Sequence, residues 1–97
     1  MKREYINNYL EENYPDQEIL LADGFEQAFM GVAESFGSAP KAFYDSNKCI
    51  DILVERDGMT LEEAVEYFEF NVTGAYVGEF TPAFISLFDE EWDSVSA

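Results

Sequence analysis

The sequence predicts a small α+β domain from three observations. Segments whose apolar residues recur with helical spacing alternate along the chain with shorter apolar runs that suit strands. The 97 residues are the length of one compact domain. Hydrophobic residues make up 47% of the chain and aromatic residues 16%, which is enough apolar material for a core. We expect residues 1–97 to form a single domain, with a mainly antiparallel sheet of three or four short strands and two or three helices on one face.

The N-terminal segment predicts a helix over residues 2–13, because its apolar residues follow one helical stripe. These residues are Tyr5, Ile6, Tyr9 and Leu10. Pro15 ends the helix. The apolar run over 18–22 predicts a short strand, which stops at the turn signal Asp23-Gly24.

Residues 25–36 fit either a helix or a strand, and we favour a strand over 28–34. A loop at 37–40 then leads to a short strand over Lys41–Tyr44. Asp45 or Ser46 suits the N-cap of a helix over residues 46–57. Gly58 suits the left-handed position that ends such a helix.

The clearest helix start is Thr60-Leu61-Glu62-Glu63, which matches the capping box. It predicts a helix from residue 61 to about 76 that Gly78 ends. The predicted apolar face of this helix consists of Leu61, Ala64, Val65, Phe68, Val72, Ala75 and Tyr76. A last strand is expected over Ala83–Phe88, and residues 89–97 are expected to form a loose acidic tail.

Charge is abundant and unevenly placed. The chain has 21 acidic and five basic residues, a net charge of −16. Residues 1–56 hold eleven acidic and all five basic residues, net −6, whereas residues 57–97 hold ten acidic and no basic residues, net −10. Direct binding of nucleic acid is disfavoured because phosphate contacts require Lys and Arg. Membrane binding is disfavoured as well, since no apolar run approaches the about 20 residues that span a bilayer and an anionic surface would repel the chain.

Catalytic chemistry has little support in the residue types present. The chain contains no histidine, which excludes Ser-His and Cys-His pairs, His-ligated zinc and the commonest general acid or base. The single Cys49 cannot form an internal disulfide, which favours a reducing cytoplasm. We interpret it as a small, partly buried helix residue. No segment has the ligand spacing of a calcium loop, so we expect no enzymatic activity, no cofactor and no metal site.

An array of glutamates is the strongest positive signal. Glu62, Glu66 and Glu69 have the spacing of one helix face, and with Glu63 they place four charges along about 10 Å of helix. That is about one charge per 2.6 Å, between the spacing of about 3.4 Å in a single DNA strand and about 1.7 Å along the duplex. The alternative is a solvated helix surface. The candidate partner-binding face consists of Glu62, Glu63, Glu66, Glu69, Glu79, Asp89, Glu90 and Glu91.

Part of the chain resembles a group of small proteins encoded by tailed bacteriophages and prophages. The resemblance is carried by Asp57-Gly58-Met59-Thr60, by residues 66–79 (EYFEFNVTGAYVGE) and by Thr81-Pro82. It also takes in residues 22–25 and Tyr44-Asp45, and it brings no catalytic residue with it. Small acidic phage proteins often block host proteins that handle nucleic acid, including restriction and CRISPR effectors, by presenting carboxylates where phosphates bind.

The sequence therefore leaves two alternative functions, of which the first is the one we favour. The first is a phage-type accessory protein in the host-cell cytoplasm that binds and inhibits or modulates a host protein with a basic surface, as DNA mimics and anti-CRISPR or anti-restriction proteins do. The alternative is a small-ligand-binding or structural accessory protein that forms a homodimer. This alternative is indicated by a surplus of aromatic residues, unless these residues fill the core. The aromatic residues concerned are Tyr67, Phe68, Phe70, Tyr76, Phe80 and Phe84.

Overall fold

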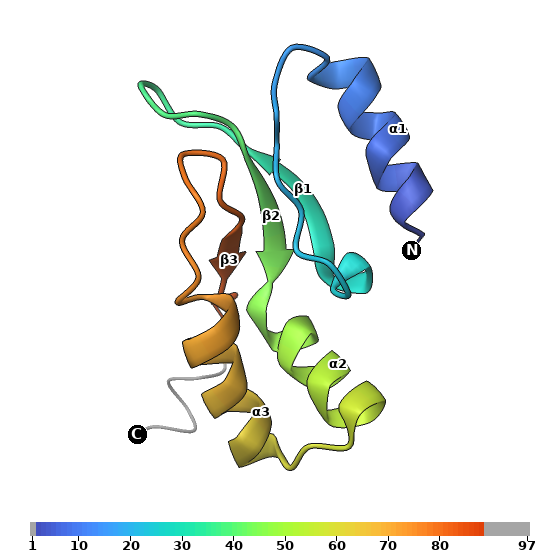
Figure 1. Cartoon of the computed structure of the whole chain (residues 1–97), viewed down its shortest axis with the longest axis vertical. Helices are drawn as coiled ribbons and strands as arrows, with labels where there is room; N and C mark the ends of the chain where they lie inside the picture. The colour runs from blue at the N-terminus through green and yellow to red at the C-terminus, as the bar shows by residue number, and fades with distance from the viewer. Residues whose placement is uncertain (1, 89–97) are drawn as a thin grey trace.

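The computed structural model describes residues 2–88, which form a three-stranded sheet and three α-helices (Figure 1). The predicted α+β class is confirmed. In chain order the elements are α1 (Arg3–Asn13), β1 (Phe29–Ala33), β2 (Lys41–Asp45), α2 (Ser46–Asp57), α3 (Leu61–Tyr67) and β3 (Ala83–Ile85). A 3-10 turn, η1 (Glu26–Ala28), precedes β1, and a π-helical turn, η2 (Phe68–Val72), continues α3. The predicted tail, residues 89–97, lies outside the described residues.

The sheet is mixed, with β2 in the centre. The β1–β2 pair is antiparallel and places Phe29 opposite Tyr44, whereas the β2–β3 pair is parallel and places Tyr44 opposite Phe84. The parallel pair departs from the mainly antiparallel sheet that the sequence predicts. A parallel pair needs a long crossover, and α2, α3 and the loop after η2 supply it. Figure 1 shows α2 and α3 side by side at one end of the molecule and α1 beside β1 at the other end.

Helix α2 has the predicted bounds because both of its ends are fixed locally. Asp45 is the N-cap, and its carboxylate accepts hydrogen bonds from the backbone N–H of Asn47 (2.9 Å) and of Lys48 (3.3 Å). Gly58 closes the helix with φ of 69°, in the left-handed region. The alternative cap, Ser46, is the first residue of the helix.

The core is organised around Tyr44 of β2, which is completely buried. Its ring stacks on Phe84 and meets Phe29 edge-on, both with ring centroids 5.6 Å apart. Phe84 in turn meets Phe68 edge-on at 5.3 Å. A continuous row of aromatic rings therefore joins all three strands to η2. The remaining buried residues of this core are Phe25, Ala28, Ala42, Cys49, Leu53 and Ala64.

The segment 18–22 is not a strand, which corrects the prediction made from its apolar run. Ile19, Leu21 and Ala22 do pack against the core, but from irregular backbone. Their position is fixed by one side chain, since the backbone N–H of Ala22 donates a hydrogen bond to the hydroxyl of Tyr44 (2.8 Å). Over residues 25–36 the favoured strand is confirmed as β1. The last strand is shorter than predicted, because it ends at Ile85.

The helix predicted from residue 61 to about 76 is shorter and changes its winding. It widens into the π-turn η2, and the backbone N–H of Thr73 bonds to the carbonyl of Phe68 at 2.9 Å, five residues back. At Gly74 a Cβ atom would lie 3.0 Å from two backbone carbonyl oxygens of η2, so a side chain there would press on the backbone of this turn. As a result Ala75 and Tyr76 are exposed and lie outside the helix, and Gly78 lies in the loop that follows.

The start of α3 is the predicted capping box. The backbone N–H of Glu63 donates to Thr60 Oγ1 (3.1 Å), and the backbone N–H of Thr60 donates to Glu63 Oε1 (2.9 Å). Replacing Thr60 with Ala removes the first of these bonds, and we expect the free energy of unfolding to fall by about 1 kcal/mol. Urea denaturation followed by circular dichroism measures this change.

The control for this prediction is Ser86→Ala, which removes a hydroxyl group from an exposed residue outside α3. We expect the control to match the wild type. Equal stabilities of Thr60→Ala and Ser86→Ala would contradict a stabilising role for the cap.

Candidate functional site

The three glutamates with helical spacing remain on one side of α3 and η2. Glu62, Glu66 and Glu69 are all exposed. The ion pairs within residues 2–88 are Arg3–Asp23 and Arg56–Asp57, so none of these glutamates has a basic partner in the described chain. Glu63 differs, because its carboxylate is held by the backbone N–H of Thr60.

A hollow beside Glu66 is also lined by aromatic rings. Its volume is about 370 Å³, and it is lined by Met59, Glu63, Glu66, Tyr67, Phe70 and Asn71. The exposed fraction is 42% for Tyr67 and 74% for Phe70. Carboxylates and the faces of aromatic rings both attract cations. This surface is therefore suited to Lys or Arg side chains.

The structure sorts the predicted acidic face into three parts. Glu62, Glu63, Glu66 and Glu69 lie together on α3 and the first turn of η2. Glu79 is exposed but belongs to the loop between η2 and β3. Asp89, Glu90 and Glu91 lie outside the described residues.

Sequence reasoning missed Tyr67 and Phe70 as members of the site. The available signal was that both fall outside the apolar stripe of α3, of which Ala64 and Phe68 are buried. Aromatic residues that point away from the buried stripe of an amphipathic helix must face solvent or a partner. Leu61 belongs to the predicted stripe, yet it is 65% exposed at the first position of the helix.

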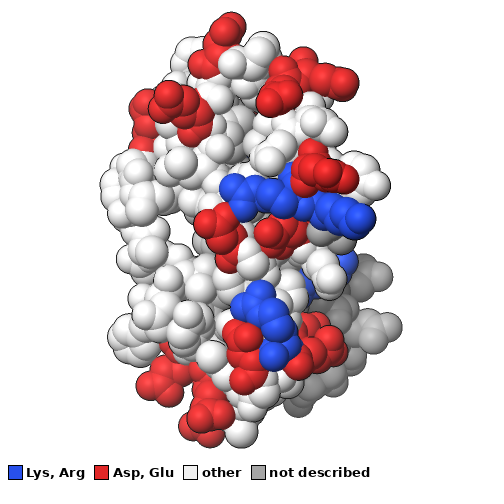
Figure 2. Space-filling view, turned by 45° about the vertical axis from the view of Figure 1, so that its right-hand side comes forward, with Lys and Arg blue, Asp and Glu red and all other residues white. Residues whose placement is uncertain are grey.

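The basic residues lie elsewhere and have acidic neighbours. On the face shown in Figure 2, basic side chains occupy the middle, and acidic side chains surround them and extend to both ends. Arg56 donates from Nε and Nη2 to the two carboxylate oxygens of Asp57, each at 3.0 Å, and from Nη1 to the carbonyl of Gly24 at 2.6 Å. Hydrogen bonding to Arg56 lowers the pKa of the Asp57 carboxyl. The same guanidinium lies over the ring of Phe25, so Arg56 also ties α2 to the segment before η1.

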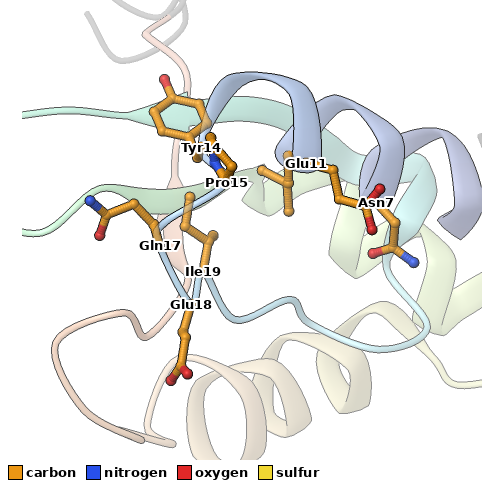
Figure 3. Close-up of a pocket in the computed structure, with 8 residues that line it drawn as sticks. Asn7, Glu11, Tyr14, Pro15, Gln17, Glu18 and Ile19 are labelled. Atoms are coloured by element: carbon orange, nitrogen blue, oxygen red, sulfur yellow. The ribbon is translucent and has the colours of Figure 1, made fainter.

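Another hollow lies between α1 and the segment that follows it, with a volume of about 340 Å³ (Figure 3). Figure 3 shows Glu11 beside Asn7 on α1, whereas the carboxylate of Glu18 points away from both. The two carboxylates therefore do not converge on one point. Within residues 2–88 there is no group of three or more Cys, Asp and Glu side chains placed to hold a metal ion.

A further hollow of about 300 Å³ lies between the segment 21–25 and the chain from Tyr67 to Phe84. Phe25, Val72 and Phe84 are among its lining residues. Its volume is at the lower limit of small-molecule sites, which are about 300–1,000 Å³.

Comparisons with protein-family models, with curated proteins and with solved structures found no match. In the described part of the chain, no helix has both the length and the apolar character required to cross a membrane.

Cys49 lies inside the core, where the sequence predicted partial burial. It is completely buried on α2, and this burial raises the pKa of its thiol to about 12, with a smaller contribution from the charge of Asp45. The thiolate is the nucleophilic form of cysteine. A thiol with this pKa and no access to solvent is protonated at neutral pH.

The raised pKa of Cys49 predicts how stability depends on pH. In the unfolded state the thiol has a pKa of about 8.5. Above that pH the unfolded state therefore loses a proton that the native state retains until about pH 12. The stabilising contribution is fully present below the unfolded pKa and is lost as the pH rises toward the folded pKa. The free energy of unfolding should therefore fall between pH 9 and 10.5, by up to about 1.4 kcal/mol per pH unit from this group.

Urea denaturation at several pH values tests this prediction, with Cys49→Ala as the comparison. Burial also raises the pKa of Tyr44, and Tyr44 is present in both proteins, so only the difference between the two slopes reports Cys49. We expect a shallower fall in the variant. Parallel slopes would show that the thiol does not titrate differently in the native and unfolded states.

Proposed function

We propose that this chain binds a protein with a Lys/Arg-rich surface through α3 and η2, and that binding inhibits or modulates that protein. One observation carries the proposal: three exposed carboxylates without basic partners in the described chain share α3 and η2 with two exposed aromatic rings, and one of the three, Glu66, lines the same hollow as both rings. We call this surface the acidic-aromatic face, and it consists of Glu62, Glu66, Glu69, Tyr67 and Phe70.

Arginine is the side chain that this face fits best. A guanidinium group donates paired hydrogen bonds to a carboxylate such as Glu66 and stacks on an aromatic ring such as Phe70. Both residues line the same hollow, so one arginine can meet both groups there. Buried aromatic residues supply much of the affinity of an interface, whereas exposed charges mainly increase the association rate and make it depend on salt.

A partner that handles nucleic acid is the class we propose. Glu62 and Glu69 are seven positions apart with Glu66 between them, so at a rise of about 1.5 Å per residue the mean spacing of the three is about 5 Å. That is wider than the about 3.4 Å between phosphates of one strand, because the carboxylate of Glu63 is bound to the cap. The face therefore imitates nucleic acid by its charge more than by its spacing. The resemblance to phage proteins supports a host nucleic-acid-handling or defence protein in the host cytoplasm.

The glutamates should determine whether the partner is captured. The variant combines Glu62→Gln, Glu66→Gln and Glu69→Gln, and it is compared with wild type in a pull-down from bacterial lysate at low salt, with identification by mass spectrometry. We expect wild type to retain a nucleic-acid-binding protein. With the purified partner, the triple variant should bind at least about tenfold more weakly, because the partner's basic groups lose their counter-charges.

The matched control removes the same amount of charge elsewhere, through Asp16→Asn, Glu18→Gln and Asp51→Asn, at three exposed positions outside α3. Binding by wild type and by this control should weaken equally as salt is raised. The proposal is wrong if wild type retains no nucleic-acid-binding protein, or if the two triple variants bind alike.

Phe70 should contribute affinity without contributing stability. Its side chain is 74% exposed, so Phe70→Ala should change the free energy of unfolding by less than about 0.5 kcal/mol. Loss of the ring should weaken partner binding by about tenfold, the effect of an aromatic interface residue. Isothermal titration calorimetry with the purified partner measures this loss. The control is Phe36→Ala, a fully exposed phenylalanine in the β1–β2 connection, and equal effects of the two substitutions would refute a specific role for Phe70.

A further inference from the structure

Helix α1 presents an apolar surface that the described chain does not cover. Ile6 is the only buried residue of this helix. The exposed fraction is 59% for Tyr5, 40% for Tyr9 and 49% for Met30 of β1. These side chains border a hollow of about 320 Å³ between α1 and β1. A helix of eleven residues gains most of its stability from packing, and one buried side chain provides little of it.

The charges of α1 are arranged against its own dipole. Lys2 and Arg3 lie at the N-terminal end, and Glu11 and Glu12 lie in the last turns, where no basic residue occurs. A helix is stabilised by acidic residues at its N-terminus and basic residues at its C-terminus. Glu4, in the first turn, is the one charged residue of α1 whose position suits the helix dipole. The order of charges on α1 therefore destabilises this helix when it is isolated. The same order is favourable next to a neighbouring helix that runs in the opposite direction.

A second copy of α1, antiparallel to the first, supplies that neighbour. Lys2, Tyr5, Tyr9 and Glu12 follow one stripe, with spacings of three, four and three residues. When two copies pair about an axis near residue 7, Lys2 faces Glu12 of the partner subunit and Tyr5 faces Tyr9 of the partner subunit. The positive end of each helix dipole also lies beside the acidic residues of the other copy.

We propose that the stripe of Lys2, Tyr5, Tyr9 and Glu12, together with Met30, is the interface of a homodimer with twofold symmetry. The inference is independent of the proposed function, because the acidic-aromatic face lies on α3 and remains accessible in this arrangement of α1. The charge of −16 on each copy opposes association. We therefore expect a weak dimer, with a dissociation constant below about 1 mM but above about 1 μM.

Sedimentation equilibrium of the full chain at physiological salt tests the proposal. The mass of wild type should rise with concentration from 11.1 kDa toward twice that value. Tyr5→Glu places a buried charge in the interface and should keep the monomer mass throughout. The control Tyr76→Glu introduces the same charge at a residue that is 77% exposed in the loop after η2, and it should associate as wild type does. A wild-type mass that stays at 11.1 kDa up to about 1 mM overturns the proposal, and so does association of Tyr5→Glu equal to that of Tyr76→Glu.

A charge exchange tests the antiparallel register. Lys2→Glu and Glu12→Lys should each weaken association at least about fivefold, and the double variant, which has the wild-type net charge, should restore it. Both single substitutions improve the match of α1 to its own dipole, so a loss of association cannot come from melting of the helix. Asp51→Lys on α2 controls for the altered net charge of Glu12→Lys. A double variant no tighter than the weaker single variant overturns the register and with it the proposal.

Discussion

The hydrogen bond from the Ala22 backbone to the Tyr44 hydroxyl is the contact on which the rest of the fold depends. Tyr44 is completely buried in the central strand, and leaving its hydroxyl without a partner would destabilise the fold by about 1–3 kcal/mol. The bond holds an irregular segment over the sheet where no strand ladder is present. The ring of the same residue contacts Phe29 of β1 and Phe84 of β3, so one side chain joins both neighbouring strands. A third strand of only three residues is stable in this setting because its aromatic side chain stacks on Tyr44.

Packing of this core determines which side chains of α3 remain available at the surface. Ala64 and Phe68 are buried against it, and the wider turn of η2 still lets Val72 reach it. The side chains between these positions must then face outward, which leaves Tyr67 and Phe70 exposed next to the glutamates. Mutual repulsion of the glutamates is tolerated because water and counterions screen charges at the surface. The acidic-aromatic face is thus the solvent side of the helix that closes the core.

Features set by neighbouring residues could be predicted from the sequence, whereas features set by distant contacts could not. The cap at Asp45, the left-handed Gly58 and the Thr60 capping box each involve residues within a few positions of one another. The conformation of residues 18–22, the parallel pairing of β3 and the early end of α3 depend on segments far apart in the chain. Of the six aromatic residues that pointed to the ligand-binding alternative, Phe68 and Phe84 pack in the core, Phe80 is half-buried, and Tyr67, Phe70 and Tyr76 are exposed. Composition alone could not show which of these aromatic residues are buried and which are exposed. The glutamates could be predicted because their charge and spacing are visible in the sequence.

The proposed partners of α1 and α3 differ because the charges of the two helices differ. Helix α1 carries basic residues at one end and acidic residues at the other, an order that is complementary to an antiparallel copy of itself. The side of α3 that carries Glu62, Glu66 and Glu69 has one sign only, so two copies of it repel one another. All five basic residues lie at or before residue 56. Residues 57–97 of a second copy therefore contain no cation that could pair with α3. Under the two proposals, a different, basic molecule supplies the cations for α3, whereas a second copy of the chain is the partner of α1.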